Sequence, residues 1–143
     1  MPRVQSLSSD DLIVVTGGAG FIGSHIVSHL AEDGLRVAIS DRFGSGDKWR
    51  NIASARLYDL VRPDMLFEWL ERHSGKVAAI VHMAAISSTT EPDIDRFVAK
   101  NIRLTLDLWE WCAANATRFI YASSAATYGD GGAGFSDDQS PAA

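Results

Sequence analysis

The sequence has few of the features of a secreted, membrane or nucleic-acid-binding protein. It contains one cysteine, Cys112, so no internal disulfide can form, and its apolar neighbours in a helical pattern predict a buried, unreactive thiol. The longest apolar run, residues 77–86, includes a histidine and is too short to cross a bilayer. Residues 1–11 are polar and end in two aspartates, unlike a secretory signal. Because neither a secretory signal nor a membrane-spanning run is found, a cytoplasmic location is expected. The net charge of −5 without a basic cluster disfavours nucleic-acid binding.

Strand-like and helix-like segments alternate along the chain. Its 143 residues suit one domain that buries roughly two-thirds of its unfolded surface. The predicted elements are a strand over 12–16, a helix over 21–33, a strand over 36–40, a turn over 48–52, a strand over 55–58, a helix over 64–73, a strand over 77–83, a helix over 93–114 and a strand over 118–122. Repeated strand–helix–strand units predict an α/β fold with a doubly wound parallel sheet in the order 3-2-1-4-5.

Three glycines at three-residue intervals, Gly17, Gly20 and Gly23, follow the first predicted strand. A strand that turns into a helix over glycines leaves backbone N–H groups at the helix N-terminus, where they bind a pyrophosphate. Asp41 stands 18 residues beyond Gly23, where a carboxylate accepts hydrogen bonds from the ribose of a dinucleotide. The pattern predicts a Rossmann-type dinucleotide-binding domain; a Gly-rich turn without a ligand is the alternative.

The end of the chain departs from this pattern. Five strands are predicted where the doubly wound dinucleotide fold has six. We expect a disordered extension over residues 1–11, a Rossmann domain over residues 12–128 that is truncated after its fifth strand, and a loop or tail over residues 129–143.

Motifs along most of the chain resemble the extended short-chain dehydrogenase/reductase family. They are Thr16-Gly17-x-x-Gly20-x-x-Gly23, Val81-His82-x-Ala84-Ala85, Asn101-x-x-x-Thr105 and Tyr121-Ala122-Ser123-Ser124-x-x-x-Tyr128-Gly129. Within the family, residues 41–51, 87–91 and 121–129 look like those of the ADP-glycero-manno-heptose 6-epimerases of lipopolysaccharide core synthesis. That resemblance implies transient oxidation and re-reduction of one sugar carbon with bound NADP. Another nucleotide-sugar epimerase or dehydratase, such as a UDP-sugar 4-epimerase, and a non-catalytic NAD(P)-sensing module remain alternatives.

The coenzyme preference depends on the residues after the second strand. Asp41 alone favours NAD, because a carboxylate repels a 2′-phosphate, whereas the cations Arg42 and Lys48 can hold one. The epimerases that the chain resembles pair an acid with a lysine at the position of Lys48 and use NADP, so NADP is expected and NAD is the alternative. Arg42 and Lys48 can equally be solvated loop charges.

The resemblance assigns further residues to the coenzyme and the sugar. Phe21 and Ile22 would offer amides to the pyrophosphate, and Asp59 and Leu60, just after the predicted third strand, match the position at the edge of the adenine. The other coenzyme positions are Met83, Ala84, Ala85, Ser87, Asn101 and Ser123. Ser88 and Thr89 lie in a hydroxyl-rich loop that would meet the sugar or, alternatively, cap the next helix.

Ser124 is the predicted catalytic residue. It lies at the carboxyl end of the fifth strand, where open α/β sheets hold ligands, and its hydroxyl can both donate to and accept from the reacting sugar oxygen. The family's proton donor belongs to a Tyr-x-x-x-Lys pair, which the 143 residues lack; Gly132 stands where a lysine would follow Tyr128. We therefore expect an inactive, marginally soluble part of a longer epimerase.

Two helical patterns have structural explanations. His25 and His29 have the spacing of metal ligands, but no third ligand accompanies them, so no metal is expected. Trp109 and Trp111 are expected to pack the long helix first and to form a subunit interface second, since the resemblance implies a homo-oligomeric parent protein.

Overall fold

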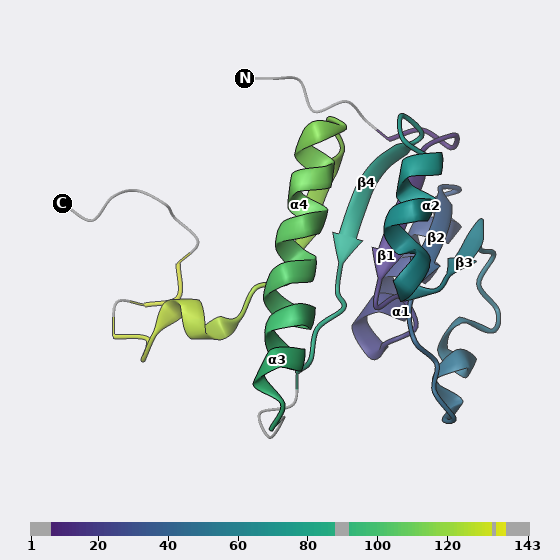
Figure 1. Cartoon of the computed structure of the whole chain (residues 1–143). Coiled ribbons are helices and arrows are strands. Elements are labelled where there is room, and N and C mark those ends of the chain that lie inside the picture. Colours follow the sequence, from purple (N-terminus) through teal and green to yellow (C-terminus); the bar gives the residue numbers. More distant parts are fainter. Residues whose placement is uncertain (1–6, 88–91, 133, 137–143) are drawn as a thin grey trace.

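A five-stranded parallel sheet in the order β3-β2-β1-β4-β5 forms the centre of the computed structural model, which describes residues 7–87, 92–132 and 134–136 (Figure 1). The strands are β1 (Leu12–Thr16), β2 (Arg36–Ser40), β3 (Asp59–Val61), β4 (Val77–His82) and β5 (Arg118–Tyr121). β1 pairs with β2 on one side and β4 on the other, so Val14 lies opposite both Ala38 and Ile80. The predicted fold class and strand order are confirmed.

Helices cover both faces of the sheet. α1 (Phe21–Glu32) lies on one face, and α2 (Leu66–Arg72) lies on the other with the long helix made of α3 (Ile94–Phe97), the π-helical segment η3 (Val98–Arg103) and α4 (Leu104–Ala114). The remaining helical segments are the 3₁₀ turns η1 (Asp47–Ile52), η2 (Pro63–Met65) and η4 (Ala125–Tyr128). Within the described residues, no helix is long and apolar enough to cross a membrane.

The sheet separates two hydrophobic cores. Side chains alternate along β1, so Leu12 and Val14 pack with α2 and α4, while Ile13 and Val15 pack with α1. All four are almost fully buried, as expected for a parallel strand covered on both sides. Cys112 lies in the α2–α4 core and is 1% exposed, which confirms that its thiol is buried, and this burial raises the pKa of the thiol to about 11.

The position predicted for the third strand is wrong. It was expected over residues 55–58, but β3 pairs with β2 through Asp59, Leu60 and Val61. Ala55 and Leu57 are apolar because they pack against the α1 core from a loop, which imitates the alternation of a strand. Of the three residues of β3, only Val61 is buried, so this edge strand has almost no hydrophobic pattern.

Candidate dinucleotide-binding site

The glycine turn between β1 and α1 is closed by contacts that leave no room for side chains. Gly17 has a φ of +68°, and a Cβ there would lie 2.8 Å from the amide nitrogen of Ala84. A Cβ on Gly23 would lie 2.1 Å from the carbonyl oxygen of Gly17, so α1 can approach the turn only because residue 23 is glycine. A Cβ on Gly20 would lie 3.2 Å from the carbonyl oxygen of Gly17, which is a tight contact, although it would meet no other part of the chain beyond its neighbours within 4 Å.

The first amides of α1 are at the carboxyl edge of the sheet. The helix begins at Phe21, directly after Gly20, whose carbonyl accepts the N–H of Ser24 at 2.9 Å. The first N–H groups of a helix have no acceptor within the helix, and they carry its positive dipole end. The side chains of Phe21 and Ile22 point outward and are exposed, so neither is needed in the core.

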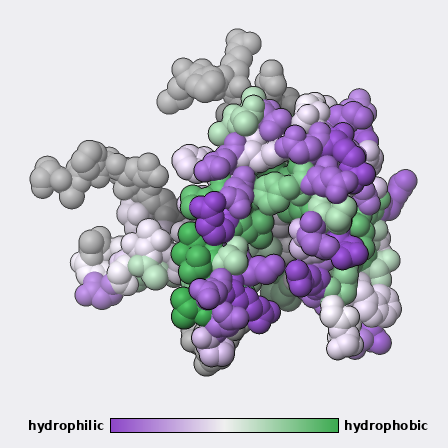
Figure 2. Space-filling model, in the orientation of Figure 1, coloured by the Kyte–Doolittle hydropathy of each residue, from purple (hydrophilic) through white to green (hydrophobic). Residues whose placement is uncertain are grey.

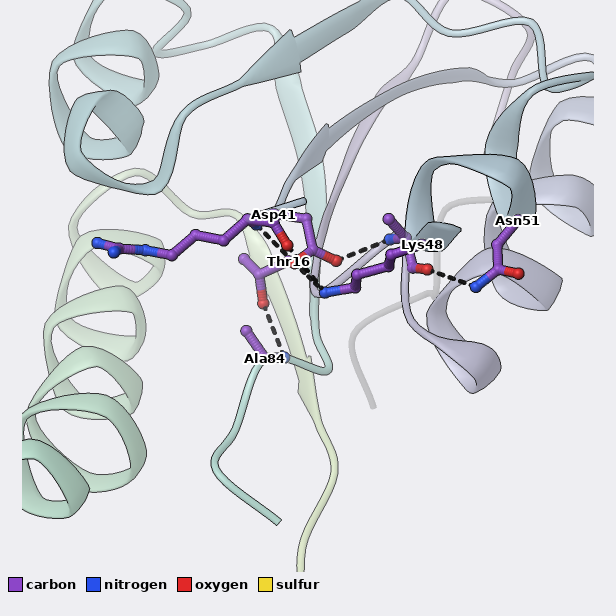
Figure 3. Close-up of polar contacts among 7 residues, drawn as sticks. Thr16, Asp41, Lys48, Asn51 and Ala84 are labelled. Carbon is purple, nitrogen blue, oxygen red and sulfur yellow. Dashed lines mark hydrogen bonds and ion pairs between the residues drawn. The ribbon is translucent and has the colours of Figure 1, made fainter. Parts of the chain in front are cut away.

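The carboxylate of Asp41 holds several groups together at the end of β2 (Figure 3). Oδ2 accepts the N–H of Ala19 at 2.9 Å, and Oδ1 accepts the N–H of Arg42 at 2.7 Å and forms an ion pair with Nζ of Lys48 at 2.5 Å. The Asp41 side chain is only 8% exposed, so its charge is compensated mainly by these partners. Asn51 completes the arrangement by donating from Nδ2 to the carbonyl of Ala19 at 2.9 Å.

A cleft of about 540 Å³ lies beside this arrangement. It brings together the predicted residues of the glycine turn, of the segment after β2 and of the segment after β4, namely Gly17, Gly20, Asp41, Arg42, Lys48, Met83, Ala84 and Ala85. Its opposite wall comes from η2 and the long helix, with Pro63, Arg96 and Leu104 among its residues. The sequence pointed to one residue of this wall, Lys100, as a weaker candidate beside Asn101, but not to the others, although residues 96, 100, 104 and 107 share the spacing of one helix face.

His82 is buried beneath the cleft in a chain of hydrogen bonds. Thr105 donates its hydroxyl proton to the carbonyl of Asn101 at 3.0 Å, so its oxygen accepts from Nε2 of His82 at 3.1 Å. Nδ1 of His82 then accepts from the hydroxyl of Thr16 at 2.6 Å, and that oxygen accepts the N–H of Ala84 at 3.3 Å. These bonds place the proton of a neutral ring on Nε2, and burial lowers the pKa of His82 below its usual 6.5, which favours the neutral form.

Asn101 lies inside the π-helical segment and binds the loop after β4. Its side chain accepts the N–H of Ile86 at 2.7 Å and donates to the carbonyl of Ile86 at 2.9 Å. Asn101 itself is not among the residues that line the cleft, whereas Ile86 is. Asparagine is a poor helix former, and these two bonds explain its presence here.

The other predicted residues lie away from the cleft lining or outside the described residues. Asp59 and Leu60 belong to β3 rather than following the third strand, and the Asp59 carboxylate accepts the indole N–H of Trp69 at 2.7 Å. Ser123 and Ser124 follow β5 at the carboxyl edge and are exposed, with Ser124 Oγ capping η4 through the N–H of Ala126 at 3.2 Å. Phe21, Ile22, Gly23 and Ser87 do not line the cleft, and Ser88 and Thr89 are outside the described residues.

Among the described residues, no group of three His, Cys, Asp or Glu side chains comes together that could hold a metal ion. The cleft is lined by backbone groups of the glycine turn, by the cations Arg42, Lys48, Arg96 and Lys100, and by the carboxylates Asp41 and Asp107. A parallel sheet in this order, with a glycine turn and a helix N-terminus at its carboxyl edge, has the architecture of the Rossmann dinucleotide-binding proteins.

The chain belongs to the NAD dependent epimerase/dehydratase family, which matches residues 13–142. Within it, the chain is similar to the ADP-L-glycero-D-manno-heptose-6-epimerase of Fusobacterium nucleatum, with 45% identity over 91% of this chain and 40% of the relative. The chain thus spans about two-fifths of the length of that enzyme.

Solved structures of epimerases share the fold. The ADP-L-glycero-D-manno-heptose-6-epimerase of Helicobacter pylori superimposes with a TM-score of 0.72 and 28% identity, over 89% of this chain and 43% of that chain. The UDP-glucose 4-epimerase of Brucella ovis in complex with NAD superimposes with a TM-score of 0.66 and 31% identity, over 83% of this chain and 37% of that chain. The resemblance inferred from the motifs is confirmed at the level of the family.

Proposed function

We propose that this chain binds NADP and supplies the coenzyme-binding part of a nucleotide-sugar epimerase that acts on an ADP-heptose in the synthesis of the lipopolysaccharide core precursor. The observation that carries the proposal is the cleft, whose wall combines the glycine turn with Asp41, Arg42 and Lys48. The 45% identity to an ADP-heptose 6-epimerase supports the choice of sugar nucleotide. We also propose a cytoplasmic location, as the sequence features favour, and a homo-oligomeric whole protein, as the resemblance implies.

The residues present fit a dinucleotide coenzyme. Gly20 lines the cleft directly before the start of α1, so a phosphate there can approach its backbone, and the amides of Phe21 and Ile22 are proposed to donate to it. The small residues Ala84 and Ala85 allow a ribose to lie close to the chain after β4. When bound, the coenzyme supplies the group that accepts a hydride from the sugar and returns it.

The pair of Asp41 and Lys48 supports NADP over NAD. An unpaired carboxylate at the end of β2 would repel a 2′-phosphate, but the charge of Asp41 is balanced by Lys48 at 2.5 Å. Arg42 adds a second cation to the same wall of the cleft. The wall is therefore net positive around the expected ribose, and a phosphate is stabilised there.

Ser124 is the proposed catalytic residue of this chain. Its Oγ accepts the N–H of Ala126, so its hydroxyl proton is still available for a sugar oxygen. The sequence contains no Tyr-x-x-x-Lys pair, so no residue here is assigned to proton transfer. We therefore propose that these 143 residues bind coenzyme but do not turn over a nucleotide sugar by themselves.

Coenzyme titrations of the chain and of Lys48→Met test the proposal, with the fluorescence of the four tryptophans as the signal. The unchanged chain should bind NADPH at least tenfold more tightly than NADH, because a lost charge-assisted hydrogen bond corresponds to about 1.5–3 kcal/mol. Lys48→Met should abolish most of this preference by weakening NADPH alone. A chain that binds neither coenzyme contradicts the proposal, and a preference for NADH contradicts its NADP part.

A UDP-sugar 4-epimerase is the second candidate, because such an enzyme from Brucella ovis shares the fold at a TM-score of 0.66. The two candidates differ in the sugar nucleotide of the whole protein. Turnover of an ADP-heptose supports the first candidate, while turnover of UDP-galactose or UDP-glucose alone supports the second.

A further inference from the structure

Asn51 makes a contact with the glycine turn that the proposed function leaves unused. It lies in η1, far along the sequence from the turn, yet its Nδ2 donates to the carbonyl oxygen of Ala19 at 2.9 Å (Figure 3). Ala19 has no exposed surface, so its carbonyl depends on protein groups for a hydrogen bond.

The N–H of the same residue is also held by a side chain. Asp41 accepts it at 2.9 Å, so both peptide groups that flank Ala19 are fixed by the segment after β2. The second of these peptide groups carries the N–H of Gly20, which donates to the carbonyl of Gly17 at 3.0 Å. Rotation of that peptide group would break both bonds at once.

The bonds of Asp41 and Asn51 to Ala19, together called the clamp below, lie directly before the start of α1. Gly20 is the residue before α1, and its carbonyl accepts the N–H of Ser24 at 2.9 Å. The orientation of the peptide between Ala19 and Gly20 therefore determines the direction in which α1 leaves the turn. The directions of the Phe21 and Ile22 amides follow from it.

We infer that Asn51 is a positioning residue for a pyrophosphate: without touching the ligand, it holds with Asp41 the peptide groups that aim the first amides of α1. The inference rests on the proposed binding of a dinucleotide. It assigns to Asn51 an effect on phosphate recognition that is separate from that of Lys48, which lies three residues earlier in η1 and pairs with Asp41.

Binding measurements on the full chain separate these effects. The variant Asn51→Ala removes the bond to Ala19, and Asn115→Ala is its matched control, because Asn115 Nδ2 also donates to a backbone carbonyl, that of Trp111, at 2.9 Å but at the end of α4. Each protein is titrated with NADPH, which contains a pyrophosphate, and with adenosine 2′-monophosphate, which does not. NADH and adenosine replace them if the chain prefers NADH.

Asn51→Ala should weaken NADPH binding about tenfold and leave the affinity for adenosine 2′-monophosphate within about twofold. Asn115→Ala should change neither. An equal loss of affinity for both ligands would mean that Asn51 acts through the segment of Lys48. No loss of affinity for NADPH would mean that the clamp does not orient the amides. Either result overturns the inference. If the unchanged chain binds neither dinucleotide, the proposed function fails as well.

Hydrogen exchange gives a second readout that needs no ligand. In Asn51→Ala the amides of Ala19 and Gly20 should exchange faster, while those of β4 keep their rates, because only the turn is released. A general rise in exchange across the sheet would indicate lost folding rather than a released turn. Unchanged exchange at Ala19 and Gly20 overturns the inference whatever the binding result.

Discussion

The hydrogen-bond pattern around His82 determines its protonation state. The hydroxyl of Thr16 points its proton at Nδ1, and the oxygen of Thr105 receives the proton on Nε2. A second ring proton on Nδ1 would face a donor, and burial would penalise the added charge. Both effects favour the neutral ring, which agrees with the lowered pKa.

This predicts a specific acid sensitivity. The pKa of His82 is lowered by burial in the folded chain, whereas the unfolded chain keeps the ordinary value of 6.5. Between these two values the unfolded state binds more protons, so stability from His82 is complete above pH 6.5 and is lost as the pH falls toward the folded pKa. In urea titrations the loss of stability between pH 7.5 and pH 5 should be smaller for His82→Gln than for the unchanged chain.

His29→Gln is the control for this experiment, because His29 is exposed and lies on α1 away from the network. It should retain the full pH dependence of the unchanged chain. Equal pH dependence in His82→Gln and the unchanged chain would show that His82 does not contribute.

At the residue scale, spacing predicted the parts that depend on backbone geometry. Gly17 and Asp41 meet at the cleft because glycine intervals and strand ends constrain where the chain runs, whereas the expectation for Lys48 came from the family resemblance. Spacing could not show which groups the side chains hydrogen-bond in the folded chain. Asp41 binds Ala19 and Lys48, and Asp59 binds Trp69, because nearby protein groups satisfy them in the fold.

At the scale of elements, apolar runs located β1, β2 and β4 closely, since a strand covered on both faces is apolar almost throughout. β5 was located closely as well, although it is an edge strand whose last two residues are exposed. The short edge strand β3 and the π-helical segment η3 had no such signal. Within η3, Asn101 bonds to Ile86 in the loop after β4, which is a contact that a local helix pattern does not reveal.

The contact between α1 and the glycine turn yields a prediction at this scale. Gly23→Ala would place a Cβ 2.1 Å from the carbonyl oxygen of Gly17, so α1 must move away from the turn. We expect a loss of about 3 kcal/mol in the free energy of unfolding, the upper end of the range for overpacking. Urea denaturation measures this loss.

Gly46→Ala is its matched control, because a Cβ at Gly46 meets no atom within 4 Å. Its stability should stay within about 0.5 kcal/mol of the unchanged chain. A Gly23→Ala chain as stable as Gly46→Ala would contradict the close packing of α1 on the turn.

At the scale of the whole molecule, the long helix has an exposed apolar face. Ile94, Val98, Ile102 and Trp109 share one side of it, and Figure 2 shows hydrophobic surface over this helix. Trp111 instead is buried and donates its indole N–H to Glu71 at 2.7 Å, as its predicted packing role requires. Exposed apolar stripes of this kind promote association in water.

We expect the chain to associate in a concentration-dependent manner through this face. Trp109 is 58% exposed, and Trp109→Lys should raise the dissociation constant at least tenfold, since tryptophans often dominate such contacts. Sedimentation velocity at several concentrations measures the change. The control is Trp49→Lys, because Trp49 is 52% exposed but lies on η1. This variant should associate like the unchanged chain. Equal dissociation constants for the two variants would rule out the long helix as the contact.

The two cores on either side of the sheet have a consequence for engineering. Leu108 and Val27 are both fully buried but belong to different cores, divided by a layer of backbone. Substitutions that share no neighbours combine by simple addition of their effects. Stabilising substitutions selected in the core beneath α1 can therefore be transferred unchanged into a chain whose core beneath α4 has already been redesigned. The two cores can be optimised in parallel libraries.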